Sequence, residues 1–113
     1  MKSKVTKQEN ITIIALEGSL MGGPDATSLN TQLHDLLNAK SSSIVLDLGG
    51  VDFMNSSGLG MLIGSASTVK NAGGTLKLAQ ASDKIIELIK ITKLSPLFEH
   101  FPTVKAAAES FKK

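Results

Sequence analysis

A run of apolar residues near the middle of the chain, Ile44-Val45-Leu46-Asp47-Leu48, constrains the fold more than any other segment. It lacks the alternation of apolar and polar residues that marks a half-exposed strand, so it predicts a short strand covered on both faces. We expect this strand to end at Gly49-Gly50. A chain of 113 residues with 42% hydrophobic residues can build one core around it, which predicts a single domain over residues 1–113.

The other segments alternate between strand-like and helix-like patterns. Periodicity and capping residues predict strands at 5–8 and 11–17, a loop at 18–24, and a helix from its N-cap Asp25 to about Ala39. After the strand at 44–48 they predict a helix from about Ser57 to Asn71 and a strand at 75–79. A helix capped by Ser82, an edge strand at Leu97-Phe98 and a helix capped by Thr103 complete the chain. This order predicts an α/β fold, with a mixed, mostly parallel sheet of four to five strands, about four packed helices and right-handed crossovers.

The composition excludes several kinds of site. There is no cysteine, so disulfides, thiolate metal sites and a cysteine nucleophile are excluded. The net charge is only +2, Trp and Tyr are absent and the lysines are scattered, so we expect no direct contact with nucleic acid. The N-terminus lacks the apolar region of a signal peptide, and no apolar run approaches the roughly 20 residues that span a bilayer. We therefore expect a cytoplasmic protein without a membrane segment.

The segment Asn55-Ser56-Ser57-Gly58 follows the central strand and opens the second predicted helix. Sites in sheets of this class form beyond the C-terminal ends of the parallel strands, and a helix N-terminus leaves backbone N–H groups unpaired. Each of Asn55, Ser56 and Ser57 can cap a helix, so the local chemistry leaves two interpretations open. One is a simple helix cap, and the other is a binding or modification site.

The second predicted helix has an unusual composition. It contains Gly58, Gly60 and Gly64, each of which costs about 1 kcal/mol relative to Ala in a helix. It carries no charged residue from Asn55 through Val69, whereas an exposed helix face normally carries Lys and Glu. On a helical wheel, the face opposite the apolar stripe consists of Gly60, Met61, Gly64 and Thr68. We interpret this face as a protein-contact surface; the alternative is a helix covered by another part of the chain.

Two successive segments resemble the signature of STAS domains, and more narrowly that of bacterial anti-sigma factor antagonists. They are the core strand at 44–48 and the residues Val51-Asp52-Phe53-Met54-Asn55-Ser56-Ser57-Gly58-Leu59-Gly60. Similarity extends to Gly18-Ser19-Leu20 in the family's first loop and to Asn71-Ala72-Gly73-Gly74 after its second helix. The resemblance implies the STAS-like fold. Asn55 departs from the family, which usually has Asp there, so a STAS scaffold or transporter-associated regulatory module without a switch stays open as the alternative.

The resemblance also implies a partner-switching mechanism. In the family, the unphosphorylated antagonist binds an anti-sigma factor that is also a serine kinase, and so releases a sigma factor. Phosphorylation ends this complex, and a PP2C-type phosphatase reverses the modification. By position the acceptor is Ser56, with Ser57 as the second choice. The protein is expected to be mostly monomeric when free, and the residues expected to bind a partner are Met21, Gly22, Gly23, Asn55, Ser56, Ser57, Gly58, Gly60, Met61, Gly64 and Thr68.

Catalysis is not expected. Ser56 would need a base, and neither histidine is a convincing one, because His34 and His100 are better assigned to surface or packing roles. Asp47 and Asp52 are too few to form a metal site without further ligands. No catalytic residue, metal or cofactor is therefore predicted.

Overall fold

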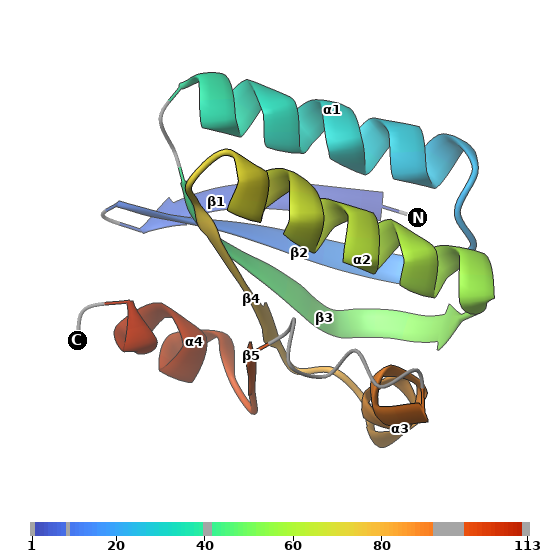
Figure 1. Ribbon diagram of the computed structural model, residues 1–113. Coiled ribbons are helices and arrows are strands. Elements are labelled where there is room, and N and C mark those ends of the chain that lie inside the picture. Colours follow the sequence, from blue (N-terminus) through green and yellow to red (C-terminus); the bar gives the residue numbers. More distant parts are fainter. Residues whose placement is uncertain (1, 9, 40–41, 92–98, 112–113) are drawn as a thin grey trace.

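The computed structural model describes residues 2–8, 10–39, 42–91 and 99–111 (Figure 1). In chain order its elements are β1 (Lys2–Gln8), β2 (Ile11–Leu20), α1 (Pro24–Asn38), β3 (Ser43–Met54), α2 (Ser56–Asn71), β4 (Thr75–Ala79), α3 (Asp83–Ile91), β5 (Glu99–Phe101) and α4 (Val104–Ser110). The strands form one sheet in the order β1-β2-β3-β4-β5, in which β1 is antiparallel to β2 and the other neighbours are parallel. The predicted α/β fold with a mixed, mostly parallel sheet and packed helices is confirmed.

Helices cover both faces of the sheet. Helices α1 and α2 lie side by side on one face, and α4 lies on the other (Figure 1). The larger core joins the sheet to α1, α2 and α3, and it includes Ile14, Leu46 and Leu62. The smaller core lies under α4 and includes Val45 and Ala107. Because neighbouring residues of β3 enter different cores, the expectation of a central strand covered on both faces is confirmed.

The central strand does not end at Gly49-Gly50, as the sequence suggested. Strand β3 continues to Met54, and β2 likewise continues to Leu20, well into the predicted loop at 18–24. The register shifts along this stretch, as at β-bulges. A Cβ on Gly50 would lie 2.7 Å from Cγ of Glu17, so glycine permits a close approach of the two strands. These glycines mark irregular pairing inside a continuous strand, which the sequence pattern could not distinguish from a strand end.

Helix α1 begins two residues earlier than expected, and Asp25 is not its N-cap. The N-cap is Gly23, whose φ of 60° lies in the left-handed region that favours glycine. Pro24 opens the helix, where its missing N–H removes no intrahelical hydrogen bond. Asp25 lies in the first turn instead, where its negative charge interacts favourably with the helix dipole.

Most of the remaining boundaries follow local signals. Strand β4 covers the predicted residues 75–79. Ser82 and Thr103 cap α3 and α4 as expected, because each hydroxyl accepts a hydrogen bond from a backbone N–H of the helix that follows, at 3.3 and 3.0 Å. The edge strand expected at Leu97-Phe98 lies outside the described residues, and β5 begins at Glu99.

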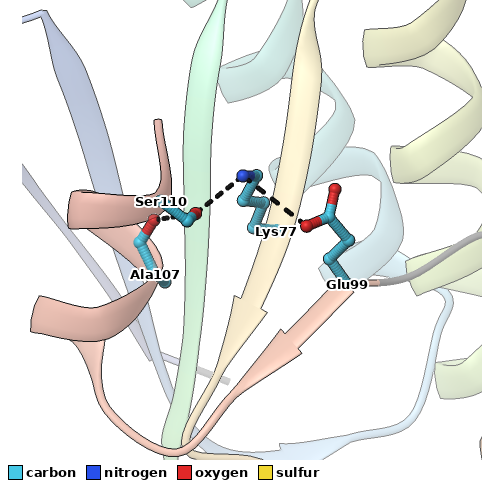
Figure 2. A network of polar contacts seen from close by, with 4 residues as sticks. All are labelled: Lys77, Glu99, Ala107 and Ser110. Carbon is cyan, nitrogen blue, oxygen red and sulfur yellow. Dashed lines mark hydrogen bonds and ion pairs between the residues drawn. The ribbon is translucent and has the colours of Figure 1, made fainter. Parts of the chain in front are cut away.

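A buried lysine ties α4 to the sheet. Lys77 on β4 is only 7% exposed, and its ammonium group donates a hydrogen bond to Oγ of Ser110 at 2.6 Å and pairs with the carboxylate of Glu99 at 3.6 Å (Figure 2). The same nitrogen lies 4.4 Å from the ring centroid of Phe111 and 5.5 Å from that of Phe101, within the range of cation–π attraction. Lys77 therefore joins the last helix to β4 and β5.

Candidate phosphorylation and partner-binding site

The turn at 55–58 lies where two parallel strands end side by side. Strands β2 and β3 stay paired as far as Leu20 and Met54, and the N–H of Asn55 donates to the carbonyl oxygen of Leu20 at 3.3 Å. The loop that leaves β2, residues 21–23, therefore lies close to the start of α2. This is the edge at which sites of open α/β sheets form.

Asn55 is the residue that caps α2. Its extended backbone (φ −98°, ψ −177°) precedes the first helical residue, and its Oδ1 accepts a hydrogen bond from the N–H of Gly58 at 2.8 Å. Its carbonyl oxygen accepts the first intrahelical bond, from Leu59 at 2.9 Å. The sequence left the cap open among Asn55, Ser56 and Ser57, and the structure assigns it to the amide side chain. Capping therefore requires neither serine.

The two serines differ in their surroundings although both are exposed. A Cβ added to Gly22 would lie 2.9 Å from Cβ of Ser57, which shows that the 21–23 loop packs against Ser57. Among the described residues, neither hydroxyl makes a hydrogen bond. Ser56 therefore presents an exposed hydroxyl that does not cap the helix, at the N-terminus of α2, where backbone N–H groups remain unpaired.

The helix glycines have different explanations. Gly58 is buried, and a Cβ there would overlap the carbonyl oxygen of Leu20, so the contact of α2 with β2 requires glycine. Gly60 and Gly64 are exposed, and a Cβ on either would meet nothing within 4 Å. Packing within the chain accounts for Gly58, whereas Gly60 and Gly64 leave the outer face of α2 open to a partner.

Met61 lines the same groove as Gly60, Gly64 and Thr68, but it is only 7% exposed and belongs to the core. The helical wheel did not predict this burial. The reason is that α2 has two buried sides, because it packs on the sheet and also beside α1 (Figure 1). A groove of about 460 Å³ separates the two helices, with Thr27 and Asn30 of α1 facing Gly60 and Thr68 of α2.

The residues expected to bind a partner thus fall into three groups. The exposed ones are Met21, Gly23, Ser56, Ser57, Gly60 and Gly64. Asn55 and Thr68 are half-buried, and Gly22, Gly58 and Met61 are buried. Ser56, Ser57 and the loop at 21–23 share the end of the molecule at which β2 and β3 finish, and Gly60 and Gly64 lie further along α2.

The sequence interpretation missed the last residues of β3. Phe53 is 53% exposed, and Asp52 accepts a hydrogen bond from Oγ of Ser19 at 3.4 Å, between the ends of β3 and β2. Both residues lie beyond Gly49-Gly50, where the strand was expected to end. The available signal was a large aromatic residue three positions before Ser56.

The start of α2 is uncharged. Helix α2 has no acidic residue in its first turn, and its first charged residue is Lys70, in the last turn. No group of three or more His, Cys, Asp or Glu that could hold a metal ion occurs among the described residues. In the same part of the chain, no helix is long and apolar enough to cross a membrane.

These features belong to a known class of domain. The sequence matches the STAS domain family over residues 2–107, and the chain therefore belongs to that family. Among its relatives is BtrV of Bordetella bronchiseptica, whose name assigns it to the anti-sigma factor antagonists. BtrV is 27% identical over 112 residues, which cover 99% of this chain and 96% of BtrV. The resemblance stated from the sequence is confirmed.

Solved structures share the fold. The crystal structure of a protein of Thermotoga maritima, described as an anti-sigma factor antagonist, matches with a TM-score of 0.87 at 20% identity, over 98% of this chain and 95% of that one. The Bacillus cell fate determinant SpoIIAA, in its phosphorylated form, matches with a TM-score of 0.73 at 16% identity, over 96% and 99% of the two chains. At these identities the likeness concerns the fold.

Proposed function

We propose that the chain is an anti-sigma factor antagonist and that phosphorylation of Ser56 switches it off. The observation that carries the proposal is the state of Ser56, an exposed hydroxyl that does not cap the helix and begins an uncharged helix face. The unmodified surface binds an anti-sigma factor that is also a serine kinase, and this complex releases a sigma factor. A PP2C-type phosphatase restores the unmodified form, and the cycle takes place in the cytoplasm.

The modification changes the surface more than the fold. The γ-phosphoryl group of ATP passes to Oγ of Ser56, the hydroxyl loses its proton and ADP is released. A phosphate monoester with about −1.5 to −2 charges then replaces the neutral hydroxyl. The dipole and the unpaired N–H groups at the start of α2 favour an anion, so the domain stays folded. A bound partner has to desolvate this charge, which weakens the complex.

The relatives support the class of partner. BtrV carries the name of an anti-sigma factor antagonist, and SpoIIAA, which has the same fold, has been solved in a phosphorylated form. The assignment of the phosphate to Ser56, with Ser57 as the second choice, rests on the position of Ser56 in the family's motif. The structure is consistent with it, because Ser56 is exposed and does not cap α2, whereas the loop at 21–23 packs against Ser57.

Asn55 favours one alternative function. Its amide oxygen completes the cap without a carboxylate, so the fold does not depend on the acidic residue that a kinase could recognise here. A STAS scaffold or transporter-associated regulatory module without a switch would bind its partner whether or not position 56 carries a charge. The two functions therefore differ in their response to Ser56→Asp.

The test is intact-mass measurement after incubation with purified anti-sigma factor kinases and ATP. We expect the mass of one phosphate on the unmodified chain and on Ser57→Ala, and no added mass on Ser56→Ala. Binding to the same kinase without ATP should weaken at least tenfold in Ser56→Asp, because the charge lies in the interface. Ser56→Ala should bind as the unmodified chain does.

Two outcomes contradict this proposal. Phosphate retained by Ser56→Ala but lost in Ser57→Ala would move the acceptor to Ser57. A stable complex that neither accepts phosphate nor responds to Ser56→Asp would favour the scaffold.

A further inference from the structure

A second feature of the site edge is a groove between the end of β3 and helix α3. It has a volume of about 330 Å³, and Phe53, Met54, Ile85 and Leu88 contribute apolar surface to its walls. Ile91 completes the groove at the end of α3. Phe53 and Ile91 are 53% and 75% exposed, so the described part of the chain leaves much of both side chains accessible.

The exposed apolar residues are unevenly distributed. The large hydrophobic side chains that the described residues leave exposed are Val5, Met21, Phe53 and Ile91. Phe53 and Ile91 line the groove, and Met21 follows the end of β2, which pairs with the end of β3. Val5 alone lies elsewhere, on the edge strand β1. Exposed apolar surface concentrated at one end of a molecule is typical of an interaction site.

The groove is continuous with the proposed switch. Met54 is one of its lining residues, and Ser56 lies only two positions further along the chain. Two residues span at most about 7 Å. A kinase that brings its catalytic groups to Oγ of Ser56 therefore also comes close to the end of β3, where this groove begins.

The charges around the groove indicate the chemistry of the occupant. Asp52 and Glu87 contribute negative charge to its lining and Lys84 contributes positive charge, so the lining is net acidic. A second copy of the chain related by a two-fold axis would bring this acidic surface against itself. A different protein with a basic residue beside an apolar one would complement it.

We infer that this groove is the anchor site for the anti-sigma factor, and that it receives an apolar side chain flanked by Lys or Arg of that partner. The inference rests on the proposed function and extends the interface from α2 to α3. Phe53 is then the central apolar contact, since large aromatic residues in desolvated pockets carry much of the binding energy of interfaces. Ser56 is the switch beside it.

The inference is tested by binding measurements without ATP, using the purified anti-sigma factor kinase that phosphorylates the unmodified chain. We expect Phe53→Ala to raise Kd at least tenfold, a change of about 1.4 kcal/mol. Val5→Ala is the matched control, because it also truncates a half-exposed apolar side chain but lies on β1; its Kd should stay within twofold. Thermal unfolding of both variants checks that the fold is retained.

Charge variants on α3 provide a second measurement that does not depend on truncating an apolar residue. Glu87→Lys should slow association at low salt, and Lys84→Glu should accelerate it, each by several-fold, because both residues line the groove. High salt should reduce both effects.

The outcomes separate this inference from the proposed function. If the kinase phosphorylates Ser56 but binds Phe53→Ala as tightly as the unmodified chain, the anchor site is overturned and the proposed function stands. If no anti-sigma factor binds the unmodified chain, the proposed function is overturned, and the anchor site with it. Sedimentation that shows a dimer abolished by Phe53→Ala assigns the groove to a second copy and also overturns the inference.

Discussion

Gly58 and Gly60 lie in the same helix, yet substitution of the two should have opposite effects. Gly58→Ala should destabilise the protein by about 2–3 kcal/mol, because the added Cβ overlaps the carbonyl oxygen of Leu20. Gly60→Ala should stabilise it by about 0.5–1 kcal/mol, because the Cβ meets nothing within 4 Å and alanine is the better helix former. Urea unfolding of both variants provides the measurement.

Gly64→Ala is the internal control for this pair, since its added Cβ is equally free. It should change stability in the same direction as Gly60→Ala. If all three substitutions destabilise the protein to a similar extent, helix propensity and the contact with Leu20 do not explain the effects of substituting these glycines. If Gly60→Ala stabilises the free domain but weakens binding of the partner, the open face of α2 is a contact surface.

At the scale of elements, α4 depends on Lys77 for its attachment. A helix of seven residues is marginal by itself. Lys77 supplies a hydrogen bond and an ion pair where α4 and β5 meet β4 (Figure 2), and it makes two ring contacts as well. Lys77→Ala should destabilise the protein by about 1–3 kcal/mol through the loss of packing and of these contacts. Hydrogen exchange should accelerate most in residues 104–110.

Lys105→Ala is the matched control, because it removes an exposed lysine from α4 itself. Its effect on stability should stay within about 0.5 kcal/mol. Uniform loss of protection in Lys77→Ala across the whole sheet, rather than in α4 first, would contradict the assignment of Lys77 as the local anchor of this helix.

The elements that local signals define were predictable from the sequence. Strand β4 and the caps at Ser82 and Thr103 were placed correctly, because a short apolar run and a hydroxyl before a helix act within a few residues. The path of β3 beyond Gly49-Gly50 was not, because pairing with β2 holds these glycines in the strand. Long-range contacts decided that boundary.

The candidate site, too, was only partly predictable from the sequence. The position of the turn at the end of β3 and the exposure of Ser56 follow from the order of strands and helices, which the sequence indicated. The burial of Met61 depends on α1 packing beside α2, and the groove beside Phe53 depends on where α3 packs. The periodicity of a single helix cannot show which other helices pack against it.

For the whole molecule, His100 makes stability depend on pH. Its Nε2 accepts a hydrogen bond from the N–H of Ala81 at 3.2 Å, which requires an unprotonated nitrogen, and burial lowers the pKa of His100 below its ordinary value of 6.5. The unfolded chain therefore binds more protons just below pH 6.5 than the folded protein does. The contribution of His100 to stability is present above pH 6.5 and is lost as the pH falls through the lower pKa of the folded state.

Urea unfolding at several pH values between 7.5 and 5 tests this dependence. His100→Gln keeps an acceptor at this position without a titrating ring, and it should make stability flatter with pH in this range. His34→Gln, on an exposed position of α1, controls for the loss of one imidazole. A pH profile of His100→Gln that matches that of the unmodified chain would contradict the role of His100.

The order of the strands, β1-β2-β3-β4-β5, equals their order along the chain. As the ribosome releases the polypeptide, β1 and β2 emerge first and can pair as a hairpin. Each later strand then joins the free edge of a sheet that already exists, and no earlier pair of strands has to separate to admit it. The domain can therefore fold during its own synthesis in the direction in which it is made, as nascent chains generally do.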